Sequence, residues 1–153
     1  MSIPPVSCNI EVKAPPPRAF ELFVEHMSAW WPRGRTPGAR PHVAVVIEPR
    51  RNGRWFERDE NGQETRWGTV LEYEPPRRLV LGWQLNSQFK FDAGVLTEVE
   101  ILFQDLPAGG TRVSLEHRDL ERLGTDAPTL AEKIRSGWPA RLHNFAVYTS
   151  TQT

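Results

Sequence analysis

Residues 128–149 read PTLAEKIRSGWPARLHNFAVYT and form the last periodic segment of the chain. Apolar side chains recur there every three or four residues, which is typical of an α-helix that buries one face. The members of this face are Leu130, Ile134, Trp138, Leu142 and Phe145. Gly137 and Pro139 interrupt the pattern, and because proline lacks the amide hydrogen of a helix interior, we expect a kink near the middle. The segment predicts a long C-terminal helix that needs an apolar partner surface.

Six segments upstream predict β-strands, either from a run of β-branched side chains, as in residues 43–48, or from alternation of apolar and polar side chains. In the clearest, residues 95–104, apolar side chains and Thr97 face one way while Glu98 and Glu100 face the other. The predicted strands are residues 43–48, 54–58, 65–74, 78–85, 95–104 and 111–117. Each connection between them is too short for a crossover, so the sheet must be antiparallel.

The N-terminal part predicts one more strand and two helical segments. Residues 7–13 alternate as a strand, and the prolines at 15–17 then suit the first turn of a helix. The apolar stripe of that helix is Phe20, Phe23, Val24 and Met27. A short helical turn holds Trp30 and Trp31. The predicted order is strand, helix, helix, six strands and a long helix, an α+β arrangement in which the sheet curls around the last helix.

Composition limits the classes of protein to consider. The chain has 153 residues, of which 39% are hydrophobic, and 19 basic residues balance 19 acidic ones. We expect one domain over residues 1–153, with no field that attracts nucleic acid or an anionic membrane. We find neither a signal peptide nor a membrane span, and the single cysteine, Cys8, has no disulfide partner in the chain. A cytoplasmic location is expected.

Motifs for common cofactors and metals are missing from the sequence. We find no glycine-rich phosphate loop, no nucleophile elbow and no zinc-type spacing, so no cofactor and no metal are expected. The four histidines are scattered, and surface placement suffices for His26, His42 and His143.

Two residues are weak candidates for acid–base chemistry. Alternation places His117 on the face that looks toward the last helix, where an imidazole could orient a ligand or transfer protons; a hydrogen-bonded structural histidine is the favoured reading. Glu57 shares a strand face with Trp55, and Phe56 lies on the other face. If Trp55 points inward, Glu57 is a carboxylate at a cavity wall. If Phe56 points inward, which we favour, Glu57 is a solvated charge.

An ordered set of short motifs resembles a known family. It comprises Asn52-Gly53-Arg54-Trp55-Phe56-Glu57, Asn61-Gly62, Trp67-Gly68-Thr69-Val70, Pro75-Pro76-Arg77-Arg78-Leu79-Val80, Gly82-Trp83, Thr97-Glu98-Val99, Gly109-Gly110-Thr111-Arg112-Val113, Leu115-Glu116-His117 and Gly137-Trp138. In this order and spacing, the set resembles the AHSA1-like proteins (activator of Hsp90 ATPase homologues) of the START/polyketide-cyclase-like SRPBCC superfamily. The resemblance covers nearly the whole chain.

The resemblance implies a helix-grip (START/Bet v1-like) fold, in which a curved antiparallel sheet wraps a long C-terminal helix around a largely apolar cavity. Such a cavity commonly takes a hydrophobic small molecule. The expected ligand-binding residues are Trp30, Trp31, Trp55, Trp83, Phe89, Phe91, Trp138, Leu142 and Phe145. The alternative for each aromatic is simply to fill the core.

Three functions remain as hypotheses. The first is a non-enzymatic protein that holds a hydrophobic small molecule. The second is a cavity enzyme of the polyketide cyclase or hydrolase type that uses His117 and Glu57. The third is a co-chaperone-like regulator of an ATPase, supported by the family name and by the seven arginines in residues 33–58. The eukaryotic co-chaperone carries a further N-terminal domain without a counterpart in this sequence, so we do not expect a chaperone partner. A homodimer is left open.

Overall fold

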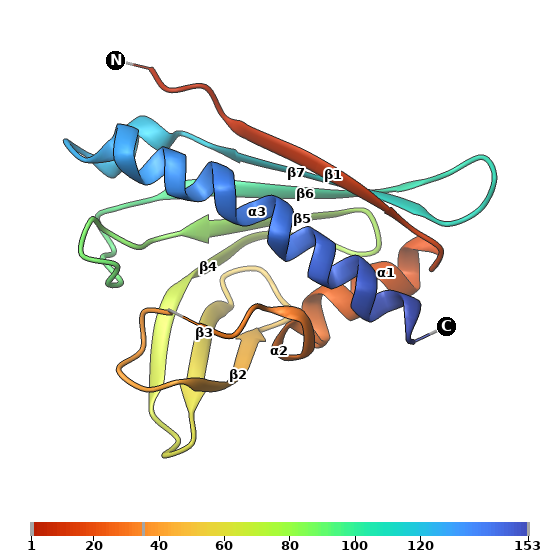
Figure 1. Ribbon diagram of the computed structural model, residues 1–153, viewed down its shortest axis with the longest axis horizontal. Helices are drawn as coiled ribbons and strands as arrows, with labels where there is room; N and C mark the ends of the chain where they lie inside the picture. The colour runs from red at the N-terminus through yellow and green to blue at the C-terminus, as the bar shows by residue number, and fades with distance from the viewer. Residues whose placement is uncertain (1, 35, 153) are drawn as a thin grey trace.

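The computed structural model describes residues 2–34 and 36–152 (Figure 1). Along the chain the elements are β1 (Val6–Val12), α1 (Pro16–Glu25), α2 (Met27–Trp30), β2 (His42–Ile47), β3 (Arg54–Asp59), β4 (Glu64–Glu74), β5 (Arg78–Trp83), β6 (Thr97–Asp105), β7 (Thr111–Arg118), a short 3₁₀ helix η1 (Leu120–Leu123) and α3 (Ala127–Ser150). This order agrees with the sequence prediction, except that η1 was not expected.

The seven strands form one antiparallel sheet in the order β1-β7-β6-β5-β4-β3-β2. The N-terminal strand closes one edge by pairing with β7, where Cys8 lies opposite Leu115. In Figure 1 the sheet curves, and α3 runs along its concave side while α1 and α2 lie near the C-terminal end of α3. The predicted α+β helix-grip architecture is therefore confirmed.

Strand alternation separates the core from the outer face of the sheet. In β6, Val99, Ile101 and Phe103 are buried against the helices. The intervening Glu98 and Glu100 accept hydrogen bonds from Arg118 at 2.9 and 3.0 Å on the outer face. The alternation expected from the sequence is thus correct for this strand.

The long helix differs from the prediction at its centre. Gly137 and Pro139 do not interrupt α3, which is continuous from Ala127 to Ser150. Pro139 removes the hydrogen bond to the carbonyl of Arg135, but both residues are exposed, so water can satisfy that carbonyl.

No helix among the described residues is long and apolar enough to cross a membrane.

Candidate functional site

All six tryptophans of the chain join in one contact network beneath α3. Trp31 is the centre, with its ring centroid 5.0 Å from that of Trp67, 5.8 Å from that of Trp138 and 6.1 Å from that of Trp55. Trp83 contacts Trp55 at 5.8 Å and Trp138 at 6.0 Å, and Trp30 contacts Trp31 at 6.1 Å. Rings from α2, β3, β4, β5 and α3 therefore form one tryptophan cluster in the core, and Trp83 is its member that lines the pocket described next.

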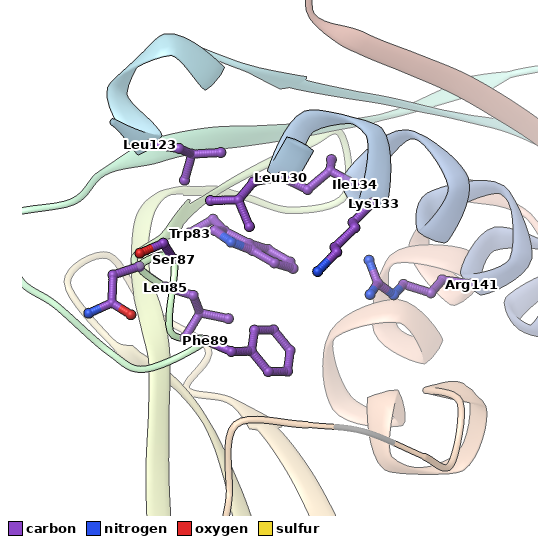
Figure 2. A pocket seen from close by; sticks show the side chains of 10 residues that line it. Trp83, Leu85, Ser87, Phe89, Leu123, Leu130, Lys133, Ile134 and Arg141 are labelled. Carbon is purple, nitrogen blue, oxygen red and sulfur yellow. The ribbon is translucent and has the colours of Figure 1, made fainter. Parts of the chain in front are cut away.

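A pocket of about 190 Å³ lies beside this cluster, between α3 and the chain that follows β5 (Figure 2). Its lining residues are Trp83, Leu85, Asn86, Ser87, Phe89, Leu123, Leu130, Lys133, Ile134 and Arg141. Most of these side chains are apolar, and the exposed Ser87 and Lys133 place the mouth at the protein surface. Mostly apolar walls with a few polar groups are the usual composition of a small-molecule site.

Arg141 brings a positive charge from α3 onto the tryptophan cluster. Its guanidinium carbon lies 4.6 Å from the ring centroid of Trp31, 4.9 Å from that of Trp138 and 5.8 Å from that of Trp83. Burial lowers the pKa of Arg141 to about 10, so the group is still a cation at neutral pH. Its Nη1 is buried, and no described residue accepts a hydrogen bond from it.

His117 lies in the core behind the pocket wall and is fully buried. The indole N–H of Trp138 donates to its Nδ1 at 3.1 Å, which leaves the hydrogen on Nε2 to donate to Thr97 Oγ1 at 2.7 Å. Burial, with a smaller contribution from the charge of Arg141, lowers the pKa of His117 to about 3. The imidazole is therefore neutral, has a partner at each nitrogen, and is outside the set of residues that line the pocket.

Glu57 is also buried, with only 1% of its surface exposed. Its carboxylate accepts hydrogen bonds from Trp67 Nε1 at 2.8 Å, from the Gly38 amide at 2.9 Å and from Thr36 Oγ1 at 2.9 Å. A β-carbon at Gly38 would lie 2.6 Å from Glu57 Oε2, so the close approach requires glycine. This carboxylate fastens the segment after α2 to β3.

The favoured reading of Glu57 as a solvated charge was wrong. Trp55 and Glu57 point inward, and Phe56 is the residue on the outer face. The guanidinium carbons of Arg54 and Arg58 lie 4.4 and 5.6 Å from the Phe56 ring centroid. Two arginines thus shield an outward aromatic, which makes it buried as well.

The other histidines do not assemble a site. His42 begins β2 and is 3% exposed, so its expected surface placement was wrong; burial lowers its pKa. His26 Nδ1 lies 2.7 Å from the hydroxyl oxygen of Tyr148, and His143 is exposed. Among residues 2–34 and 36–152, no group of three or more His, Cys, Asp or Glu side chains could hold a metal ion.

Comparison with known proteins identifies the family. Residues 13–150 match the family model described as "Activator of Hsp90 ATPase homolog 1-like protein". The chain belongs to this family. No curated protein matches this AHSA1-like chain.

Several solved structures resemble the AHSA1-like chain over its length. Txn09, described as an anthrahydroquino-gamma-pyrone synthase complexed with SUM, is 32% identical, with 95% of this chain and 96% of that chain covered and a TM-score of 0.67. CalC from Micromonospora echinospora, described as a self-sacrificing resistance protein, is 31% identical, with 97% and 96% covered and a TM-score of 0.72. MLL2253 from Mesorhizobium loti, at 16% identity, 97% and 98% coverage and a TM-score of 0.71, shows the fold alone.

The structure distributes the sequence-predicted ligand residues over three environments. Trp83 and Phe89 line the pocket. The predicted residues in the core are Trp30, Trp31, Trp55, Trp138, Leu142 and Phe145. Phe91 lies apart, with the guanidinium carbon of Arg66 4.9 Å from its ring centroid.

Sequence reasoning missed the polar side of the pocket. Arg141 follows Ile134 by seven residues and Trp138 by three, so the helical period already placed it on the apolar stripe. Leu130 and Ile134 were recognised on this stripe but were not named as pocket residues. Nothing in the local sequence indicated that Leu123 would reach the pocket from η1.

Proposed function

We propose that this AHSA1-like protein binds a hydrophobic aromatic small molecule in the pocket between α3 and the segment after β5. One observation carries the proposal: an apolar pocket open to the surface, with Trp83 and Phe89 among its walls and two cations on α3. Aromatic walls favour a flat ligand, and the cations provide orientation. At about 190 Å³ the pocket is smaller than drug-sized sites of roughly 300–1,000 Å³, so the ligand is compact or the entrance widens around it.

The two relatives above 30% identity support a role for a captured small molecule. Txn09 is described as a synthase, in a complex with SUM, and CalC as a resistance protein. A synthase must capture its substrate before it can react with it. We therefore place binding first and any later chemistry second.

A cavity enzyme of the polyketide cyclase type is the second candidate, favoured by the 32% identity to a described synthase. In such an enzyme His117 would be a poor general base, since its pKa of about 3 makes Nδ1 a weak base and both ring nitrogens already have hydrogen-bond partners in the core. The charged residues at the pocket are Lys133 and Arg141, and these groups could stabilise negative charge on a substrate oxygen.

A thermal-shift screen against lipophilic aromatic compounds tests the binding function. A ligand present at a hundred times its dissociation constant should stabilise the fold by about 2.7 kcal/mol, which at this length raises Tm by several degrees. The Leu130→Trp variant fills the pocket and should abolish the shift. Val147→Trp, at a position 52% exposed on the same helix and outside the pocket lining, is the matched control and should keep it.

Two outcomes of the screen would contradict the proposal. One is that no compound in a broad aromatic library shifts Tm. The other is that Leu130→Trp responds to the hits as strongly as Val147→Trp does, which would place binding elsewhere on the protein.

A further inference from the structure

Among the described residues, Arg141 is the arginine that has a buried guanidinium nitrogen without a hydrogen-bond acceptor. Arg78 and Arg118, for example, each pair with Glu100, at 2.6 and 3.0 Å. Arg141 makes no ion pair with any residue in 2–34 or 36–152, and its buried Nη1 has no acceptor there. The three tryptophan rings stabilise the charge through their π faces, but they offer no acceptor for the N–H groups in the guanidinium plane.

A buried donor without an acceptor is costly, and the cost disappears when a ligand supplies the acceptor. Arg141 lines the pocket, so a molecule bound there can reach its guanidinium. Lys133 lies two turns earlier on α3, and Figure 2 shows both side chains extending from the helix toward the Trp83 ring. None of the ten lining residues is acidic, so the pocket carries two formal positive charges without a compensating carboxylate.

Gly137 leaves space on α3 for the guanidinium of Arg141. Gly137 precedes Arg141 by one turn, and a β-carbon at Gly137 would lie 3.2 Å from the guanidinium carbon and Nη1. Glycine costs a helix interior about 1 kcal/mol relative to alanine. Its missing side chain leaves room for Arg141 to fold back over Trp138 and Trp31.

We propose that the ligand of this pocket is an aromatic molecule with an anionic oxygen, a carboxylate or a phenolate, and that Arg141 binds this oxygen. The ring system lies against Trp83 and Phe89, and Lys133 at the mouth attracts the same charge. This inference rests on the proposed binding function and specifies the class of its ligand.

Calorimetric titration with two matched probes, 2-naphthoate and the neutral 2-naphthamide, tests the inference at pH 7. A charge-assisted hydrogen bond to a buried guanidinium should make the wild-type protein bind the naphthoate about tenfold more tightly than the amide, or better. In Arg141→Met most of this preference should be lost, with only the weaker contribution of Lys133 left and affinity for the amide little changed. Arg135→Met removes an exposed arginine of the same helix, one that pairs with Glu132, and should keep the wild-type preference.

A measurement on the wild-type protein covers the case in which Arg141→Met does not fold. The side-chain N–H resonances of Arg141, assigned by NMR, should shift on addition of naphthoate and much less on addition of naphthamide. Equal affinities of the wild-type protein for the two probes, or an Arg141 signal that does not shift with naphthoate, would overturn the inference. Neither result would contradict the pocket proposal. If neither probe binds, the inference fails, and the thermal-shift screen decides whether the proposed pocket fails with it.

Discussion

At the scale of single residues, His117 links the stability of the core to pH. Its folded-state pKa of about 3 is well below the unfolded value of about 6.5, so between these limits the unfolded chain binds a proton that the folded chain excludes. The stability that His117 contributes is complete above pH 6.5 and is lost as pH falls toward 3. Between pH 7 and pH 5 this loss amounts to about 2 kcal/mol.

The His117→Gln variant should therefore lose less stability between pH 7 and pH 5 than the wild type does. Urea denaturation of both proteins at both pH values gives the difference, in which the other titrating groups cancel. The variant is expected to be less stable at pH 7, because it disturbs hydrogen bonds to Trp138 and Thr97. A wild-type His117 resonance that titrates near pH 6.5 by NMR would contradict the assignment of a buried neutral ring.

Glu57 is a second buried residue whose role is testable by itself. In Glu57→Gln, a neutral carbonyl oxygen replaces the charged acceptor of Trp67 and Gly38, and the new amide N–H meets the Thr36 hydroxyl, which loses its acceptor. We expect a loss of about 1–3 kcal/mol in the free energy of unfolding, measured with urea. The exposed Glu60→Gln should change it by less than about 0.5 kcal/mol. Equal stabilities for the two variants would remove the anchoring role.

At the scale of elements, α3 carries both the apolar face that packs in the core and the charged residues of the pocket. At Gly137, the stability of the helix and the space needed by the Arg141 guanidinium favour different side chains. Gly137→Ala raises helix propensity by up to about 1 kcal/mol but presses a methyl group against the Arg141 guanidinium. We expect little net change in Tm and a weakened preference for naphthoate over naphthamide. Ser136→Ala, the exposed neighbour, should leave that preference unchanged. A Gly137→Ala protein that keeps the full preference would show that Arg141 does not need this space.

The strands show how far alternation alone can predict structure. In β6 the outer face carries charges and the inner face apolar side chains, so the two faces differ and the prediction was correct. In β3 both faces carry an aromatic and a charge, and the outward Phe56 is covered by Arg54 and Arg58. Local sequence cannot state which neighbours will cover a side chain, and for this reason the orientation of Glu57 was missed.

At the scale of the whole molecule, the fold was predictable and the pocket was only partly so. Antiparallel pairing follows from short connections, and the helix-grip arrangement follows from one apolar sheet face and one apolar helix face. The pocket depends on residues from distant parts of the chain, such as Leu123 in η1 and Ser87 after β5. Their convergence is a result of packing, which periodicity does not encode.

The tryptophan cluster also gives the protein an optical property. Neighbouring indole rings with centroids 5.0–6.1 Å apart can exchange excitation energy, so the emission of the six rings reports on them jointly. A compound that quenches Trp83 at the pocket wall should therefore dim rings that it never touches, including Trp30 at the far end of the network. The protein consequently carries its own fluorescent sensor for whatever occupies the site.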